Sequence, residues 1–160
     1  MNKPFAIFSV AVALAGYALG QAQPGASAQS GTSKPMEAPM VKYFSKDDLA
    51  ASFAKGATIA EQSNYKVMTA HRNEGGLPEA HRNFTDIFYI VQGETTVIVG
   101  GKMIGDTGKN PDEPRGTSID GGETFKMAPG DSIIIPVGVP HWMKEVKGEL
   151  HYYVIKVKNE

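Results

Sequence analysis

Two histidines and two carboxylates in the second half of the chain have the types and spacing of metal ligands. Glu79 and His81 stand two residues apart in an extended segment, so both side chains face the same side. Asp86 opens an apolar run, and His141 opens another after a proline. These donors are predicted to converge from two strands and one loop. Such a mixed nitrogen and oxygen set favours Mn, Fe, Ni, Co or Zn over Mg or Ca.

Composition and motifs exclude several other chemistries. The 160-residue chain contains no cysteine, which excludes disulfides, thiolate ligands and a cysteine nucleophile. Sixteen basic and seventeen acidic residues give a formal net charge of −1. Without a basic tract, neither nucleic acid nor an anionic membrane is an expected partner. The sequence also lacks a Gly-x-Ser-x-Gly elbow, a phosphate-binding loop, His-Glu-x-x-His and a dinucleotide fingerprint. A small-molecule ligand is expected instead.

The N-terminus has the pattern of an export signal. Lys3 precedes an apolar run at 5–19, and small residues near Ala22 offer a cleavage site. This run is shorter than the roughly 20 residues that span a bilayer. Residues 1–22 are therefore predicted to be a signal peptide, and the protein to be exported to a periplasm or the medium without a membrane partner after cleavage. Residues 23–40, rich in Pro, Gly, Ser and Ala, are predicted to be a flexible linker.

Residues 41–160 are predicted to form one all-β domain with a short N-terminal helix. Ser45 and Asp48 make a capping box ahead of an amphipathic run, and Gly56 is placed to end that helix. Beyond it the chain changes to short apolar or alternating runs separated by Gly and Pro. These predicted strands cover 65–71, 86–92, 95–101, 124–128, 131–137, 141–146 and 150–158. Their number and tight turns predict a β-sandwich or barrel.

Two segments carry the proposed ligands at a recurring spacing. In EAHRNFTDIFYIVQG, four residues separate His81 from Asp86 and six separate Asp86 from Gly93. In GDSIIIPVGVPHWMKE, the chain has Gly, five residues, Pro-x-Gly, two residues, His141, three residues and Glu145. This pair of segments resembles the two motifs of the cupins. Glu79 stands at the first histidine of the cupin His-x-His pair, Asp86 at its glutamate, and Glu145 at the asparagine of the second motif.

The resemblance implies a jelly-roll β-barrel with a metal inside, commonly paired into a homodimer. His81 and His141 are the first candidates for ligands, Glu79 is the next and Asp86 the last. Asp86 is one methylene shorter than the family's glutamate, so its alternative role is a hydrogen bond to a ligating imidazole. The implied function is an exported metal-dependent enzyme of dioxygenase, isomerase or decarboxylase type. The alternatives are a non-catalytic sensor or carrier of a small ligand and a metal-free barrel.

Strand parity extends the predicted pocket. If Asp86 points inward, Phe88 and Ile90 do too, and an inward His141 implies inward Met143 and Glu145. Glu145 is therefore a candidate general acid or base; the alternative is a rim carboxylate paired with a lysine.

Three further residue positions carry weaker expectations. On the last strand, Lys156 and Lys158 are expected to face water, which turns His151, Tyr153, Ile155 and Val157 inward.

The insertion at 100–122 is long enough to form a lid over the pocket. Arg115 in this insertion is expected either to clamp a carboxylate substrate or to be solvated. His71 belongs to an earlier copy of the Ala-His-Arg-Asn sequence around His81. It lies outside both motifs, so this repetition is interpreted as accidental.

Overall fold

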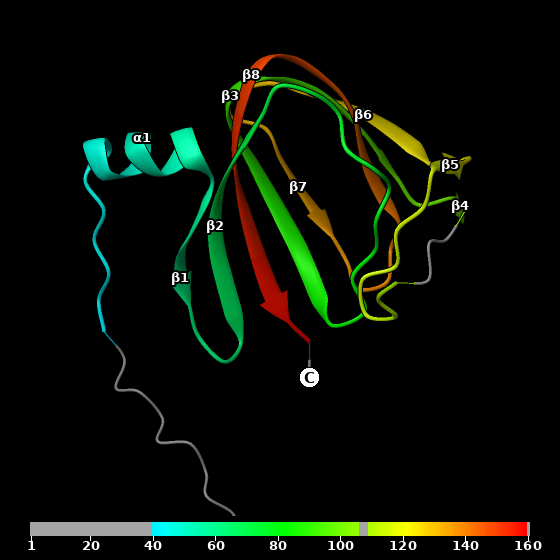
Figure 1. Ribbon diagram of the computed structural model, residues 1–160, viewed down its shortest axis with the longest axis horizontal. Helices are drawn as coiled ribbons and strands as arrows, with labels where there is room; N and C mark the ends of the chain where they lie inside the picture. The colour runs from blue at the N-terminus through cyan, green and yellow to red at the C-terminus, as the bar shows by residue number, and fades with distance from the viewer. Residues whose placement is uncertain (1–39, 106–108, 160) are drawn as a thin grey trace, which may run out of the picture. The chain divides into compact units, whose positions relative to one another are not determined.

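The structure, a computed structural model, describes residues 40–105 and 109–159 (Figure 1). The predicted signal peptide and nearly all of the predicted linker lie outside the described residues. The described chain contains one helix and eight strands: α1 (Lys46–Lys55), β1 (Ala57–Glu61), β2 (Tyr65–Arg72), β3 (Phe84–Val99), β4 (Lys102–Ile104), β5 (Ser118–Asp120), β6 (Glu123–Met127), β7 (Ser132–Ile135) and β8 (His141–Lys158). No helix among these residues is long and apolar enough to cross a membrane.

Helix α1 begins at the predicted capping box. Ser45 Oγ accepts a hydrogen bond from the Asp48 amide at 3.2 Å, and Asp48 Oδ2 accepts one from the Ser45 amide at 3.0 Å. Gly56, with φ of 64°, ends the helix as predicted. Phe53 is the buried residue of this helix, and it packs against His151 and Tyr153 of β8. The helix therefore covers the β2–β8 part of the sheet through one aromatic anchor.

Two long strands organise the sheet. Hydrogen bonding follows the order β1-β2-β8-β3-β6, β7 also pairs with β3, and all pairs are antiparallel. β3 and β8 pair along their full lengths and turn over together, at the top of Figure 1. The first half of β3 also pairs with β7 and the second half with β6. The all-β prediction is confirmed, and the strands are arranged as in a jelly roll, although hydrogen bonds do not close the barrel among the described residues.

The interior is apolar at positions where the alternation of side chains along the strands predicts inward residues. Phe88 is 5% exposed, Ile90 is fully buried, and Met143 is 7% exposed. They belong to a core cluster with Val97, Met127, Ile135, Leu150, Tyr152 and Val154. This core lies between the two halves of β3 and β8, so the inward residues at the strand ends face a common space.

The inward orientation predicted for Glu145 is wrong. Met143 pairs with Val97 and Glu145 pairs with Thr96, so Lys144 is an extra residue in β8. This β-bulge shifts the alternation by one. Glu145 is consequently exposed, and its Oε2 accepts a hydrogen bond from Thr96 Oγ1 at 3.3 Å. Its predicted role as a general acid or base required the inward orientation.

The orientation predicted for the last strand is also wrong. Leu150, Tyr152 and Val154 are the buried residues, and Lys156 points inward with them. His151 and Tyr153 face the other side of the sheet, under helix α1. Both sets of alternate residues are largely apolar, so the sequence contains no signal for the set that faces the core.

Candidate functional site

The segment at 78–82 lies beside the start of β8 and holds two of the predicted ligands there. The Glu79 amide donates to the His141 carbonyl at 2.9 Å, and the His141 amide donates back at 2.8 Å. The Gly138 amide donates to the His81 carbonyl at 2.8 Å. These backbone bonds join the two cupin-like segments directly, so the two histidines and Glu79 are brought together by main-chain geometry.

The insertion between β4 and β5 flanks the same segment on its other side. The amides of Ala80 and Arg82 donate to the carbonyls of Pro114 and Asp112, at 3.1 and 3.0 Å. The Gly116 amide donates to the Pro78 carbonyl at 3.0 Å. The described end of this insertion is therefore a wall of the site.

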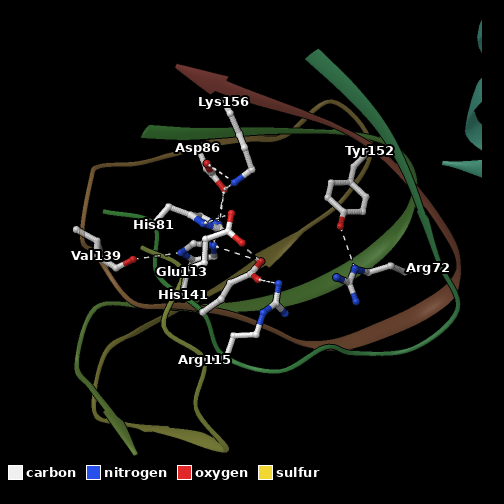
Figure 2. Close-up of polar contacts among 10 residues, drawn as sticks. Arg72, His81, Asp86, Glu113, Arg115, Val139, His141, Tyr152 and Lys156 are labelled. Carbon is white, nitrogen blue, oxygen red and sulfur yellow. Dashed lines mark hydrogen bonds and ion pairs between the residues drawn. The ribbon is translucent and has the colours of Figure 1, made fainter. Parts of the chain in front are cut away.

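Three donor atoms lie close together at the centre of the site. Glu79 Oε1 lies 3.8 Å from His81 Nε2 and 3.8 Å from His141 Nε2, and all three atoms lie within 4.8 Å of one another. Figure 2 shows the two histidines side by side, with Asp86 and Lys156 next to His81. The two imidazole centroids are 5.3 Å apart. His81 and His141 are 5% and 3% exposed, so both imidazoles are largely buried, whereas the Glu79 side chain is 21% exposed.

The buried histidine nitrogens have the pattern expected of metal ligands. His141 Nδ1 lies 3.1 Å from the Val139 carbonyl, to which it can only donate, leaving the lone pair on Nε2. Among the described residues, His141 Nε2 and both ring nitrogens of His81 are buried without a hydrogen-bond partner. Such atoms are costly unless something binds them. Two imidazoles and a carboxylate would satisfy this requirement by holding a divalent transition metal.

The electrostatics of the site favour neutral His141. Burial lowers the pKa of His141, outweighing the Val139 carbonyl and the nearby carboxylates, which act in the opposite direction. The neutral imidazole is the form that binds metal.

Arg115 orients Glu79. Its Nη2 lies 2.7 Å from Glu79 Oε2, while Glu79 Oε1 faces the histidines. This ion pair leaves one carboxylate oxygen for a metal and gives Arg115 a partner within the protein. The Arg115 side chain is 48% exposed, as its solvated alternative predicts, but its ion pair with Glu79 means that it is not free to clamp a substrate.

Asp86 lies against the same histidines but is paired with a lysine. Lys156 Nζ donates to both Asp86 oxygens at 2.9 Å, and Asp86 Oδ2 lies 3.3 Å from His81 Nε2. Burial acts to raise the pKa of Asp86, but the close approach of His81 Nε2 and the hydrogen-bonded ammonium group of Lys156 together outweigh it and lower the pKa. Asp86 is therefore an ionised carboxylate beside the three donors. Its Oδ2 approaches the same His81 nitrogen that faces Glu79, and the hydrogen bond to a ligating imidazole predicted as its alternative role would instead use the other ring nitrogen.

An open cavity of about 580 Å³ borders the cluster. Phe88 and Tyr152 provide part of its wall, and Arg72 donates from Nε to the Tyr152 hydroxyl at 3.0 Å. Among the described residues Arg72 has no salt-bridge partner, in contrast to Arg115. Sequence reasoning missed Arg72, Tyr152 and Lys156. All three depend on strand orientations that the apolar pattern leaves ambiguous.

Comparison with known proteins gives the class of protein. Residues 58–160 match the family model described as Cupin, and the chain belongs to the cupin family. A structure from Bacillus halodurans aligns over 78% of this chain and 87% of its own, with a TM-score of 0.55 and 13% identity. KdgF from Halomonas sp. aligns over 66% and 80%, with a TM-score of 0.47 and 16% identity. No curated protein matches the chain. The fold and the site together define a cupin-type small-ligand or metal-binding protein.

Proposed function

We propose that this protein is an exported cupin that binds a divalent transition metal and acts on a small organic anion. The ligands are His81, His141 and Glu79, with Asp86 as the neighbouring carboxylate. One observation carries the proposal: two buried histidines and the half-buried Glu79 face one another, and the Nε2 atoms of both histidines have no hydrogen-bond partner among the described residues. When bound, such a metal supplies a Lewis acid or oxygen-activating centre.

The surrounding residues fix the tautomer, orientation and charge of the donor side chains. The Val139 carbonyl fixes the His141 tautomer, and Arg115 fixes the Glu79 carboxylate. Lys156 keeps Asp86 ionised and in place. Phe88 packs edge-on against His141 and excludes water from one side of its ring.

The charges that line the cavity favour an anionic ligand. Three acidic and three basic side chains line it, so they balance: Glu79, Asp86, Glu113, Arg72, Arg115 and Lys156. A divalent cation would make the cavity net positive. Arg72 is the basic residue of this set without a salt-bridge partner among the described residues, and it is the proposed anchor for a carboxylate or similar group.

A non-catalytic ligand-binding cupin is the second candidate. The exposed position of Glu145 favours it, because this carboxylate is then no acid or base for a bound molecule. Turnover separates the two candidates. The metal-loaded protein would be incubated with small carboxylates, with oxygen uptake and product formation as readouts. Thermal stabilisation by a compound that is left unchanged would support the carrier.

Metal content tests the site itself. The purified protein is expected to contain metal by plasma mass spectrometry, and His81→Ala and His141→Ala are each expected to lose about one equivalent. Glu79→Gln should weaken binding, whereas Glu145→Gln, a matched change outside the cavity, should not. Unchanged metal content in both histidine variants would refute the proposal.

Export rests on the sequence of residues 1–22 and remains part of the proposal. The mass of protein recovered from a periplasmic extract or the medium should correspond to cleavage near Ala22. Recovery of the uncleaved chain from the cytoplasm would contradict it.

A further inference from the structure

A second group of metal-ligand side chains lies on the other face of the sheet. His71 of β2 and His151 of β8 are direct cross-strand partners. Their neighbours in β8, Leu150 and Tyr152, point into the core, so these histidines point away from it. Glu149 precedes His151 and reaches both rings.

The distances within this cluster fit tetrahedral coordination. Glu149 Oε1 lies 3.1 Å from His71 Nε2 and 3.3 Å from His151 Nε2, and all three atoms lie within 4.8 Å of one another. Ligands bound to Zn²⁺ at about 2.0–2.2 Å in a tetrahedron are about 3.3–3.6 Å apart. The two rings stand nearly perpendicular, at 87°, with centroids 5.1 Å apart.

Hydrogen bonds among the described residues do not satisfy every polar atom of this cluster. His151 Nε2 is within hydrogen-bonding geometry of Glu149 Oε1. His71 Nε2 is close to the same oxygen, yet it is buried and has no hydrogen-bond partner among the described residues. A buried nitrogen without a partner is costly. A metal bound to both Nε2 atoms and the carboxylate would satisfy all three groups at once.

The cluster is also held in position by its surroundings. Phe53 of helix α1 stacks on the His151 ring, with centroids 5.3 Å apart and planes 9° apart. Gln92 Nε2 donates to the Glu149 carbonyl at 3.3 Å. The Glu149 side chain is 51% exposed, so water can reach the fourth coordination position. Preorganised ligands and an open position are the features of a site that binds zinc in solution.

We propose that His71, His151 and Glu149 form a second transition-metal site, of the zinc class, separate from the cluster of Glu79, His81 and His141. Its fourth ligand is water. This site and the proposed cavity site are occupied independently, since they share no ligand. The repeated Ala-His-Arg-Asn sequence then supplies one histidine to each site, and its interpretation as an accident is revised.

The experiment removes the cavity site first. In the His81→Ala/His141→Ala variant, zinc is titrated against a chromophoric chelator, with folding checked by circular dichroism. About one equivalent of zinc is expected to bind. Adding His71→Gln and His151→Gln should weaken this binding at least tenfold, and so should adding Glu149→Gln instead. The matched control Glu94→Gln, which changes an exposed glutamate of β3, should leave it unchanged.

Absence of zinc binding in the folded background variant would overturn the second site, as would binding that is unaffected by the His71 and His151 changes. If the background variant does not fold, His71→Gln/His151→Gln is made in the unmodified chain. Bound zinc should then fall by about one equivalent, and an unchanged content overturns the inference. Loss of metal from His81→Ala alone reports on the cavity site, so the two failures are distinguishable.

Discussion

At the residue scale, the pair of Asp86 and Lys156 explains why an inward lysine is tolerated in β8. The Asp86 side chain is 2% exposed and the Lys156 side chain is 15% exposed. Because little water reaches these two charges, each charge is compensated by the other. The pair also determines how much negative charge the cavity presents to a metal. Removing one member is therefore expected to cost more than removing both.

Lys156→Met is expected to destabilise the metal-free protein by about 3 kcal/mol, because it leaves Asp86 buried without its partner. Urea unfolding measures the change. The double variant Asp86→Asn/Lys156→Met should recover part of the loss, and Lys158→Met, an exposed lysine two residues on, serves as the control. A double variant as unstable as the sum of the single variants would contradict the coupling.

Because of Tyr152, the stability of the folded protein is expected to fall as the pH rises in the alkaline range. Burial raises the pKa of Tyr152 above its ordinary value, so the folded protein keeps a phenol proton that the unfolded chain releases. The resulting stabilisation is complete below about pH 10 and is lost as the pH rises through the folded-state pKa.

Tyr152→Phe should therefore flatten the decline in the free energy of unfolding between pH 9 and pH 11, measured by urea titration at each pH. Tyr43→Phe, which changes an exposed tyrosine, should decline as the wild type does. Equal slopes in all three proteins would show that Tyr152 does not titrate in this way.

At the element scale, the shared turn of β3 and β8 brings the strand ends together. Gly93 has a φ of 79°, and a Cβ there would lie 2.6 Å from the Glu149 carbonyl oxygen. Gly148, on the facing strand, has a φ of 73° but no atom within 4 Å of a Cβ. Substitution of Gly148 would therefore measure the cost of the backbone conformation alone, and substitution of Gly93 would add the cost of a steric clash.

Gly148→Ala is expected to lower the free energy of unfolding by about 1 kcal/mol, the cost of a left-handed residue. Gly93→Ala should cost at least about 2 kcal/mol, because the facing backbone must also move. Chemical denaturation of both variants tests this. Equal costs would show that the close approach at Gly93 contributes nothing.

Helices and strands were predictable where a short stretch of sequence is enough to specify them. The capping box at Ser45 and the spacing around His81 and His141 are local, and the helix, most strands and the cupin family follow from them. The bulge at Lys144 and the inward face of β8 depend on pairing with β3, which no local pattern records. That is why Glu145 was predicted inside the cavity and Lys156 outside it. The short strands β1, β4 and β5 lack a strong alternating pattern and were missed.

At the scale of the whole molecule, three large apolar side chains are exposed together on one outer surface of the sheet. Tyr89, Val91 and Ile134 are 44%, 40% and 65% exposed, and they lie on the paired strands β3 and β7. Their side chains face away from the core residues Phe88 and Ile90. Such patches commonly mark contacts between proteins, and this one is our proposed interface for the homodimer that the family resemblance implies.

Ile134→Lys is expected to convert the proposed dimer into a monomer, because it would place two charges at the centre of the proposed interface. Light scattering gives the mass, and the unfolding temperature at low protein concentration provides the check on folding. Ile104→Lys, on the short strand β4, is the control and should remain dimeric. A monomeric wild-type protein would refute the interface.

The backbone bonds between 78–82 and the described end of the insertion have a kinetic consequence. Swinging that end away would break three main-chain hydrogen bonds beside the proposed ligands and would release Arg115 from Glu79. The cavity is already open, so entry of a ligand requires no such step. In stopped-flow mixing, the observed binding rate should consequently rise linearly with ligand concentration, without the plateau that a slow opening step imposes.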